Sequence, residues 1–373
     1  MVTQETNEKD YEKDNYYCFN NFNGSYNCTT ICFPIIWMKK ILVLLIALCL
    51  FGCAKQNEFE KLGYSPKYIE IIESYPEEYQ ELFLGEYNTE LISLMEDDNF
   101  DINRAKEYLK YYGQLDNSVV IDAVNNNKDI NRLIEVYNDE FFLEKNKQIY
   151  LDNLDNYPSV RECIEAVNTK SYLPYYTDVQ PTDLSKDYLI LVNKYNRLDE
   201  DYVPEDLLPV EPKYGRHSLR AEVYEKYKQL QDDASELGYH FTICSGYRDY
   251  ELQDYLYNKY LADEGGNVEI VDTYSARPGH SEHQSGLCAD LYDSVYGMDD
   301  FGLSDASKWL NENCYKYGFI IRYTKEKEKV TGYQAEPWQI RYVGSEEIAK
   351  FIMDKGISFD EYYACFVEWY EIK

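Results

Sequence analysis

Hydrophobic residues in the first part of the chain recur at helical spacing. Between residues 54 and 170 short amphipathic patterns alternate with polar breaks, and apolar positions fall three to four residues apart. One such stripe consists of Ile102, Ala105, Leu109 and Tyr112. The pattern predicts a small, mostly α-helical region over residues 54–170, which we expect to position or space the part that follows.

A short internal repeat occurs in the same region. The tetrapeptide Asp-Ile-Asn-Arg stands at residues 101–104 and again at residues 129–132, a period of 28 residues. Helical repeat proteins need three or more stacked units to bury a continuous core. Two copies are therefore too few to indicate a solenoid.

The pattern changes between residues 171 and 212, where prolines stand at positions 174, 181, 204, 209 and 212. Residues 188–192, Tyr-Leu-Ile-Leu-Val, form one uninterrupted apolar run among them. Such a run predicts a strand, and the prolines after it predict an extended segment. We expect residues 171–212 to be a lead-in that wraps on the next domain.

Helical and strand patterns alternate from residue 213 to residue 373, which predicts an α+β domain. Ser218 is suited to cap a helix that stops at Gly238, and Ser304 and Ser345 are suited to start two later ones. The expected elements are helices at 219–237, 250–262, 304–318 and from 345 onward, and strands at 241–244, 319–323 and 338–343.

The composition allows a packed core, because 45% of the residues are hydrophobic and 41 are tyrosines. The formal net charge of −31 argues against nucleic acid or an anionic membrane surface as a partner, since both would be repelled. The charged run Lys-Glu-Lys-Glu-Lys at residues 325–329 predicts a solvated hairpin tip.

Residues 38–53 have the layout of an export signal. Lys39 and Lys40 precede an apolar run that is too short to span a membrane comfortably, and Cys53 follows a glycine. The segment resembles a bacterial lipoprotein signal peptide, in which cleavage before Cys53 leaves that thiol to carry lipid. We therefore expect residues 1–37 to be an upstream extension that is absent from the mature protein. The lipid on Cys53 would anchor the protein to the outer face of the cytoplasmic membrane.

The remaining cysteines give no disulfide framework. After Cys53 the chain has Cys163, Cys244, Cys288, Cys314 and Cys365, an odd and widely scattered set. Buried, uncharged thiols that behave as small hydrophobes are the simplest interpretation.

Four residues of the last 130 have the chemistry of a metal-assisted hydrolase. His283 and Asp290 are spaced so that an imidazole and a carboxylate meet across a turn that enters a strand, and Zn²⁺ accepts both. Glu336 is suited to act as the general base toward water, and Arg248 offers a fixed cation for a developing oxyanion. By itself, a His beside a carboxylate is more often a structural hydrogen-bonded pair.

The motifs around these residues resemble the VanY-type family of zinc D,D- and L,D-carboxypeptidases, in the same order along nearly the whole domain. They are Ser-Gly-Tyr-Arg at 245–248, Ser-Ala-Arg-Pro-Gly-His-Ser-Glu-His-Gln at 275–284 and Glu-Pro-Trp at 336–338. The resemblance implies a central antiparallel sheet with packed helices, the D,D-peptidase or hedgehog-like zinc fold. It also implies a metal in a cleft at that sheet.

The resemblance assigns roles to the matching residues. His283 and Asp290 correspond to two zinc ligands, Glu336 to the catalytic base and Arg248 to the residue that stabilises the oxyanion. Gln253, Ser281 and Tyr323 correspond to residues around the terminal D-amino acid of the substrate and its carboxylate. His280 belongs to the motif without being a ligand, and we expect it to form a hydrogen bond or to pack against its neighbours. The implied cofactor is Zn²⁺ and the implied partners are peptidoglycan stem peptides.

The sequence departs from the family pattern at Gln339, where the family has the histidine that is the third zinc ligand. An amide oxygen is a neutral donor that zinc seldom uses, so the site would hold zinc weakly, take another metal or be empty. Three interpretations follow. They are an active metallocarboxypeptidase, an inactive lipoprotein that binds cell-wall peptides, and an interaction protein that works through its helical region. The other motif residues favour the first.

Overall fold

The computed structural model describes residues 16–20, 30–34, 58–213, 217–293 and 300–368 of the chain. The chain divides into two compact units, Met1–Ile130 and Asn131–Lys373. The predicted signal segment with Cys53 lies outside the described residues. Within the described part, none of the helices combines the length and the apolar character that a membrane span requires.

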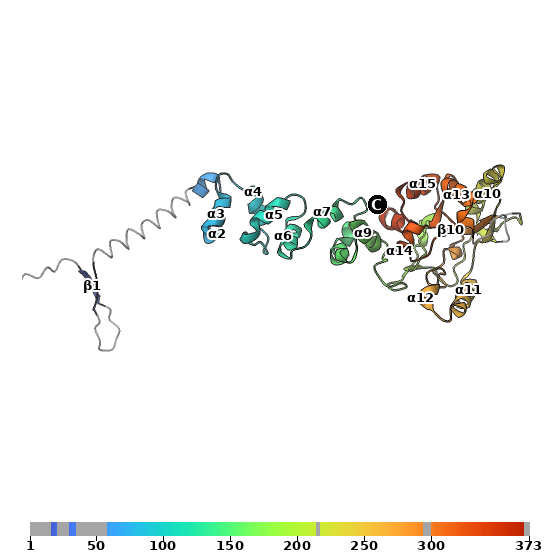
Figure 1. Cartoon of the computed structure of the whole chain (residues 1–373), viewed down its shortest axis with the longest axis horizontal. Helices are drawn as coiled ribbons and strands as arrows, with labels where there is room; N and C mark the ends of the chain where they lie inside the picture. The colour runs from blue at the N-terminus through green and yellow to red at the C-terminus, as the bar shows by residue number, and fades with distance from the viewer. Residues whose placement is uncertain (1–15, 21–29, 35–57, 214–216, 294–299, 369–373) are drawn as a thin grey trace, which may run out of the picture. The chain divides into compact units, whose positions relative to one another are not determined.

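The first unit is helical after a single strand pair, as the spacing predicted (Figure 1). The strands β1 (Tyr16–Asn20) and β2 (Thr30–Pro34) pair antiparallel. The helices are α2 (Pro66–Ser74), α3 (Glu77–Gln80), η1 (Glu81–Phe83), α4 (Thr89–Leu94), η2 (Ile102–Arg104), α5 (Ala105–Tyr111) and α6 (Asn117–Asn125).

Helices of the same kind open the second unit. They are α7 (Ile130–Asn138), η3 (Glu144–Asn146), α8 (Lys147–Asn153), η4 (Leu154–Asn156) and α9 (Val160–Asn168). The predicted mostly helical character of residues 54–170 is confirmed for the part that the structure describes.

In each unit the hydroxyl of one tyrosine forms hydrogen bonds that link two helices to the backbone of the preceding turn. In the first unit the Tyr108 hydroxyl accepts from the amide of Asp101 at 3.3 Å and donates to Asn125 Oδ1 at 2.5 Å. The Asn125 amide nitrogen in turn donates to the carbonyl of Asn99 at 2.9 Å. These bonds satisfy backbone groups at the start of η2 that the helix itself leaves unpaired.

The same arrangement recurs in the second unit. The Tyr150 hydroxyl accepts from the amide of Leu143 at 3.2 Å and donates to Asn168, whose nitrogen donates to the carbonyl of Phe141 at 2.8 Å. The structural repeat therefore relates Tyr108 to Tyr150. It does not follow the repeated tetrapeptide, whose first copy lies at η2 and whose second copy starts α7.

Residues 171–212 contain only short elements. The pairs are β3 (Gln180–Pro181) with β4 (Asn196–Arg197), parallel, and β5 (Leu207–Pro209) with β6 (Ser218–Arg220), antiparallel. The strand predicted over residues 188–192 does not form, and η5 (Leu184–Leu189) occupies part of that run. The carbonyls of Tyr188 and Ile190 instead accept from Arg341 Nη2, each at 2.9 Å. A guanidinium thus replaces the partner strand that this buried segment would otherwise need.

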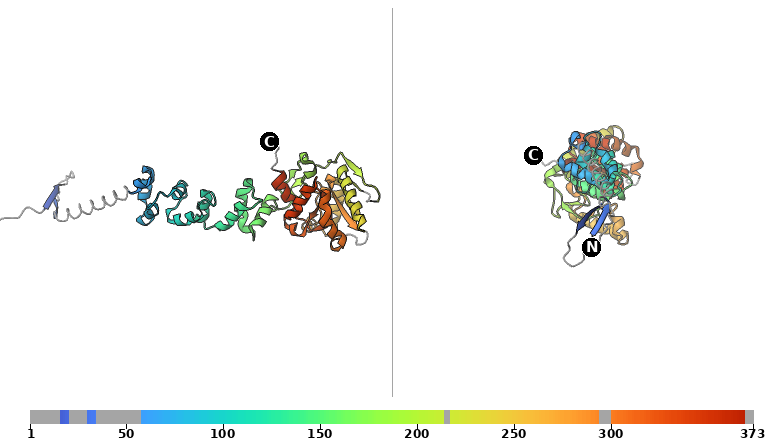
Figure 2. Two further views of the ribbon diagram at one scale, coloured as in Figure 1. Left: turned by 90° about the horizontal axis from the view of Figure 1, so that it is seen from above. Right: turned by 90° about the vertical axis from the view of Figure 1, so that its left-hand side faces the viewer.

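A four-stranded antiparallel sheet forms the centre of the second unit, which confirms the α+β prediction (Figures 1 and 2). Its order is β7 (Phe241–Ser245), β8 (Cys288–Asp293), β10 (Glu336–Tyr342) and β9 (Phe319–Tyr323). The helices after residue 220 are α10 (Ala221–Glu236), α11 (Tyr250–Asp263), α12 (Val268–Val271), η6 (Glu282–Ser285), η7 (Phe301–Leu303), α13 (Asp305–Asn313), η8 (Cys314–Tyr317), η9 (Lys325–Lys327), α14 (Glu328–Thr331), α15 (Glu346–Lys355), α16 (Phe359–Tyr362) and η10 (Tyr363–Val367).

Two local predictions were wrong. Ser218 does not cap a helix, because it pairs with Pro209 in the β5–β6 ladder and α10 begins after it. The charged run at 325–329 is not a solvated hairpin tip, because it forms η9 and the start of α14. Lys327 in that run is only 8% exposed and its ammonium lies 2.8 Å from Glu165 and 3.0 Å from Glu361. Acidic partners that are distant in sequence make its burial possible.

One face of the sheet carries the core. Ala289 and Leu291 of β8 and Ile340 of β10 pack with α10 and α13 in a single hydrophobic cluster. In Figure 1 these helices lie on one side of β10, and α11 and α12 lie on the other. Side chains alternate across a strand, so the residues between these core positions point to the opposite face.

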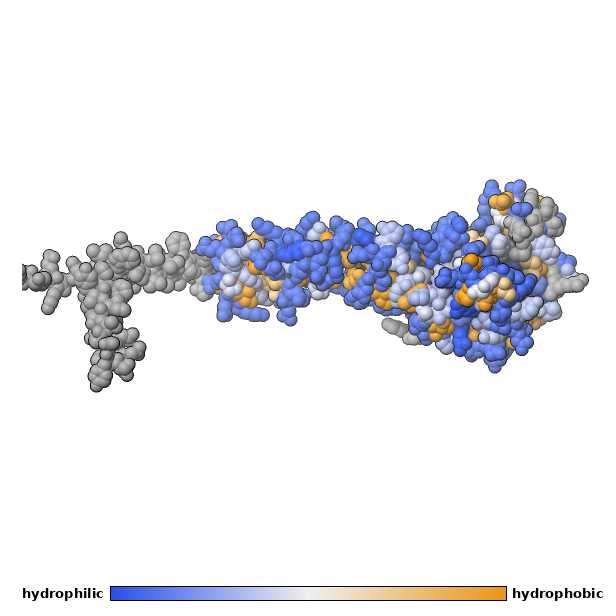
Figure 3. All heavy atoms as spheres, turned by 60° about the horizontal axis from the view of Figure 1, so that its bottom comes forward, coloured by the Kyte–Doolittle hydropathy of each residue, from blue (hydrophilic) through white to orange (hydrophobic). Residues whose placement is uncertain are grey.

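The surface agrees with the acidic composition. The face drawn in Figure 3 is mostly hydrophilic, and hydrophobic residues show there as separate patches. Five cysteines after residue 58 are free: Cys163, Cys288 and Cys314 are buried, and Cys244 and Cys365 are partly exposed. The interpretation of Cys288 as a buried thiol is therefore confirmed.

Candidate active site

The register of the central sheet brings two of the predicted ligand residues together. Asp290 of β8 and Gln339 of β10 are direct cross-strand partners, and each alternates with core residues on its own strand. Both side chains therefore lie on the face of the sheet opposite the core, where cross-strand neighbours are close. Asp290 is 9% exposed and Gln339 is 4% exposed.

A tight turn before β8 positions His283. The residue lies in η6, which ends at Gly286 in the left-handed region with φ +67°. The carbonyl of His283 accepts from the amides of Arg248 and Gly286, each at 3.2 Å. A glycine adopts this conformation without the cost that a Cβ would add.

The tautomer of His283 follows from its partner. Its Nδ1 lies 2.7 Å from the carbonyl oxygen of Gly246, which can only accept, so Nδ1 carries the proton. In the neutral ring, Nε2 then presents a lone pair, and it points at Asp290 Oδ2 at 3.3 Å. None of the described residues donates to this buried Nε2. Two lone pairs that face each other at this distance fit a cation held between them.

Glu336 stands across the pocket from this pair. It begins β10 and pairs with Tyr323 of β9, next to an irregularity in the ladder. Burial, together with the negative charge of Asp290, raises the pKa of Glu336 to about 8. Burial also raises the pKa of Asp290, but the contacts with His283 and Arg248 outweigh it, so that the net shift is downward. A carboxyl group with a pKa near neutrality is suited to take and return a proton.

The Gln339 side chain lies beside both Asp290 and Glu336. One terminal atom of its carboxamide lies 2.8 Å from Glu336 Oε2 and 3.3 Å from Asp290 Oδ1. With nitrogen at this place the amide donates to both carboxylates; with oxygen there, three oxygen acceptors face one another. The described residues contain no cluster of three His, Cys, Asp or Glu side chains suited to hold a metal. The donor set for zinc is therefore His283, Asp290 and an amide oxygen, which is one strong ligand short.

Arg248 and Gln253 form a bonded pair at the other end of the pocket. Arg248 Nε donates to Gln253 Oε1 at 3.0 Å, and the Gln253 nitrogen donates to the carbonyl of Ala276 at 2.7 Å. Arg248 Nη1 donates to the Ser245 hydroxyl at 2.5 Å and lies 3.5 Å from Asp290 Oδ2. Among the described residues none accepts from Nη2, which leaves this nitrogen for an anionic ligand.

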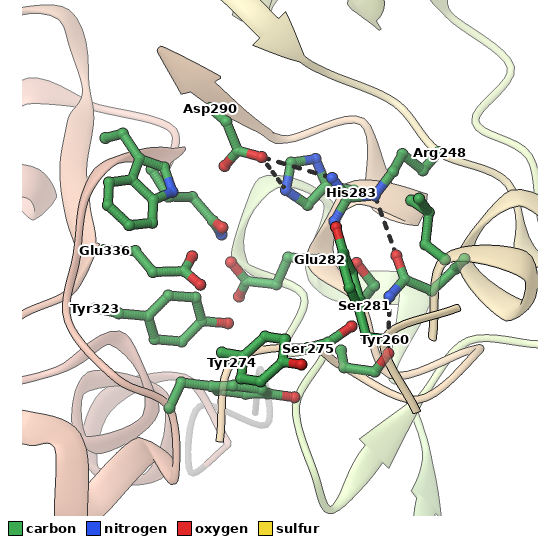
Figure 4. Close-up of a pocket in the computed structure, with 16 residues that line it drawn as sticks. Arg248, Tyr260, Tyr274, Ser275, Ser281, Glu282, His283, Asp290, Tyr323 and Glu336 are labelled. Atoms are coloured by element: carbon green, nitrogen blue, oxygen red, sulfur yellow. Dashed lines mark hydrogen bonds and ion pairs between the residues drawn. The ribbon is translucent and has the colours of Figure 1, made fainter. Parts of the chain in front are cut away.

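The residues predicted from the motifs, Ser281 and Tyr323 among them, line one open pocket of about 200 Å³ (Figure 4). The aromatic and hydroxyl residues that sequence reasoning missed are Tyr260, Tyr274, Ser275 and Tyr333. Ser275 lies within a quoted motif, whereas the tyrosines had no distinctive signal in a chain so rich in tyrosine.

Glu282 was also missed, and it links the pocket to a buried charge cluster. Its Oε1 accepts from Arg322 Nε at 2.9 Å and from Arg341 Nη1 at 3.0 Å. Arg322 Nη1 also contacts Asp360 at 2.7 Å. Two acids and two arginines thus balance one another in a place with almost no solvent.

Lys194 supports the pocket wall from behind. Its ammonium lies 3.7 Å from the centre of the Tyr333 ring and 4.7 Å from that of Tyr175, and it donates to the carbonyl of Asp272 at 2.5 Å. Burial lowers the pKa of Lys194 to about 7. Cation–π contacts of this kind hold the wall residue Tyr333 in place. The lead-in segment therefore contributes to the site, which its proline-rich sequence did not reveal.

The other histidines do not complete the metal site. His280 Nδ1 bonds to the carbonyl of Asn193 at 2.7 Å and its ring packs edge-on against Tyr176, as expected for a packing role. His217 and His240 belong to no three-ligand cluster among the described residues. Cys244 is directed at the backbone, with its Sγ 3.3 Å from the carbonyl of Asp290.

A half-buried carboxyl group opposite a His–Asp pair, in a pocket that Arg248 also lines, defines a hydrolase-type site on an α+β fold. Comparison with known proteins gives the family. VanY, described as D-alanyl-D-alanine carboxypeptidase, matches residues 216–345. YodJ of Bacillus subtilis (strain 168) is 36% identical over 206 residues, which cover 51% of this chain and 74% of that protein. The chain belongs to the VanY family of D-alanyl-D-alanine carboxypeptidases.

Three further proteins are similar to part of this chain. The D-alanyl-D-alanine carboxypeptidase of Enterococcus faecium is 39% identical over 145 residues, which cover 39% of this chain and 43% of that protein. Among solved structures, the LdcB LD-carboxypeptidase is 34% identical, with 51% of this chain and 91% of that chain covered and a TM-score of 0.46. A mutant of the vancomycin-resistance D,D-pentapeptidase VanY in complex with Zn(II) is 32% identical, with 47% and 98% covered and a TM-score of 0.42.

Proposed function

We propose that residues 213–373 form a zinc-dependent carboxypeptidase that removes a C-terminal D-amino acid, such as D-alanine, from peptidoglycan stem peptides. The observation that carries the proposal is the lone pair of His283 Nε2, fixed toward Asp290 beside the half-buried carboxyl group of Glu336. Membership of the VanY family supports the substrate class.

The chain's own residues supply the remaining chemistry. Glu336 takes a proton from the attacking water and returns it to the leaving amine, a task for which its raised pKa is suited. Arg248 donates to the oxygen on which charge develops as the carbonyl is attacked. His283, Asp290 and the Gln339 amide oxygen would hold the zinc ion, which when bound polarises the carbonyl and acidifies water.

The end of the substrate has a place in the same pocket. Ser281 is 4% exposed and lines the pocket beside Gln253 and Tyr323. Their hydroxyl and amide groups are the donors that a terminal carboxylate requires. We assign Gln253, Ser281 and Tyr323 to recognition of the terminal D-amino acid.

A second function is favoured by Gln339. Because one strong ligand is missing, a member of this family with an unfilled metal site would keep the pocket and lose turnover. Such a protein would act as a receptor for peptidoglycan peptides. The two functions differ in whether peptide is cleaved or only retained.

We further propose that lipid on Cys53 anchors the chain to the outer face of the cytoplasmic membrane, where this substrate is located. The layout of residues 38–53 supports this. Expression with a radioactive fatty acid should label the wild type. A Cys53→Ala variant should remain unlabelled and leave the membrane fraction, and label retained in that variant would contradict the anchor.

The function is tested by incubating the purified chain, with zinc added, with a stem pentapeptide that ends in D-Ala-D-Ala. Release of D-alanine is followed over time, with a tetrapeptide that carries one D-Ala as a parallel substrate. A Glu336→Gln variant is the control for contaminating peptidases. Release by wild type alone establishes the enzyme. Peptide binding without release under any divalent cation establishes the receptor instead.

A further inference from the structure

Gln339 is held where its amide has to face two carboxylates. Its backbone is fixed in the β10–β8 ladder opposite Asp290, and its side chain is 4% exposed. The inward amide atom lies 2.8 Å from Glu336 Oε2 and 3.3 Å from Asp290 Oδ1. The side chain therefore cannot avoid these oxygens, and only the choice of nitrogen or oxygen at that place is open.

The two choices suit two different states of the site. A carboxamide nitrogen carries two hydrogens, one for each carboxylate, so with nitrogen inward both acids are satisfied without any ion. With oxygen inward and Glu336 ionised, the amide oxygen, Asp290 Oδ1 and Glu336 Oε2 are all acceptors, and His283 Nε2 adds a fourth lone pair nearby. Buried acceptors without a donor are costly, and a cation among them removes that cost.

We infer that Gln339 is a two-state ligand: its amide nitrogen bridges Glu336 and Asp290 when no metal is bound, and the amide turns to present its oxygen when a divalent cation enters. This inference rests on the metal-dependent hydrolase proposed above. Metal binding in this chain then competes with two internal hydrogen bonds. A histidine at the same place has only one inward nitrogen and, as a neutral ligand, no pair of donors to give up.

The consequence is a site that is ordered without metal and binds metal reversibly. The hydrogen bonds hold Glu336 and Asp290 in place in the metal-free state, so the carboxylates do not spread apart by repulsion. Their loss on metal entry weakens the net affinity. Zinc binding thus also frees Glu336 from the amide.

The test measures zinc affinity of the full chain by competition with a coloured chelator. Gln339→His should tighten the dissociation constant by about 10- to 100-fold, the range that changes around a metal site typically produce. Gln148→His places a histidine at an exposed position of α8 and is the matched control, which should leave the constant within about twofold of wild type. Equal constants for wild type and Gln339→His would overturn the inference.

A second measurement uses the wild-type chain and does not depend on folding of a variant. With nitrogen-15 in the glutamine side chains, the Gln339 amide protons should be protected from exchange in the chelator-treated protein. Zinc should shift that signal and make it exchange with water. A signal that zinc leaves unchanged would overturn the inference.

The same samples separate this inference from the proposed function. Zinc-dependent movement of the Gln339 signal without any release of D-alanine would support the two-state ligand and defeat the hydrolase. Release of D-alanine with an immobile Gln339 signal would do the reverse.

Discussion

The buried charge cluster behind the pocket allows a stability prediction with a defined size. Glu282, Arg322, Arg341 and Asp360 are each at most 3% exposed and balance to zero charge. Asp360 Oδ2 lies 2.7 Å from Arg322 Nη1, and its Oδ1 accepts from Asn193 Nδ2 at 2.7 Å. Asp360→Asn keeps the size of the side chain and removes one negative charge, so that one positive charge remains uncompensated.

The expected cost follows from two estimates. Two unit charges about 4 Å apart attract by about 4 kcal/mol at an effective dielectric constant of about 20. Removal of one partner from a buried pair costs about 3–5 kcal/mol in measured cases, because the other charge stays desolvated. We expect Asp360→Asn to lower the free energy of unfolding by about 3–5 kcal/mol, or the melting midpoint by roughly 6–20 °C for a unit of this size.

Tryptophan fluorescence during urea or thermal unfolding measures the change, because Trp309 and Trp338 pack against the core of this unit. Asp354→Asn is the control. Asp354 also forms a 2.7 Å ion pair, with Lys350, but both side chains are at least half exposed, so its loss should leave the midpoint unchanged. Asp360→Asn combined with Arg322→Met restores neutrality and should recover part of the loss. A midpoint for Asp360→Asn equal to that of wild type would refute the reasoning.

Three further predictions concern the site and its supports. Glu336→Gln should lower D-alanine release by about 10²- to 10⁴-fold with peptide binding retained, the usual contribution of a general base, and unchanged release would exclude this role. Gly286→Ala should destabilise by about 1–2 kcal/mol from its positive φ alone. Gly286→Ala should lose more stability than the control Gly265→Ala. The new Cβ at residue 286 lies 3.0 Å from Leu207, whereas a Cβ at residue 265, where φ is +63°, has no atom within 4 Å. Burial lowers the pKa of Lys194 to about 7 in the folded chain, whereas its pKa in the unfolded chain is near 10.5. Between these two pH values the unfolded chain therefore binds one proton more than the folded chain. The unfolding free energy of wild type minus that of Lys194→Met should therefore rise from pH 7 to pH 9, and a flat difference would show that Lys194 stays charged.

Local chemistry made much of the catalytic unit predictable. Strand and helix periods identified β7, β9, α11 and the end of η8 at Gly318, because these elements bury one face and their apolar residues must repeat accordingly. The motifs also named several of the residues that line the pocket, although Tyr260, Tyr274 and Glu282 were missed. Each motif is a contiguous run that spans one turn and the strand after it, so the order of its residues already sets which of them lie close together.

Other features depended on partners that are distant in sequence. Residues 188–192 have the composition of a strand, yet Arg341 takes their carbonyls, and no local pattern announces a guanidinium so far along the chain. Lys327 is charged and was expected in solvent, yet two acids that are remote in sequence bury it. In both cases the free energy of a tertiary contact exceeded the local preference.

The sequence by itself determined which chemical groups are available to this protein: an imidazole, two carboxyl groups, a guanidinium and an amide in place of a ligand histidine. The tertiary structure alone decided how these groups meet. It fixed the proton of His283 on the Gly246 side, set Gln339 opposite Asp290, placed Glu282 in the pocket wall and placed Lys194 behind it. The direction of a lone pair and the exclusion of solvent depend on which residues pack around a group, and the order of residues along the chain does not show this packing.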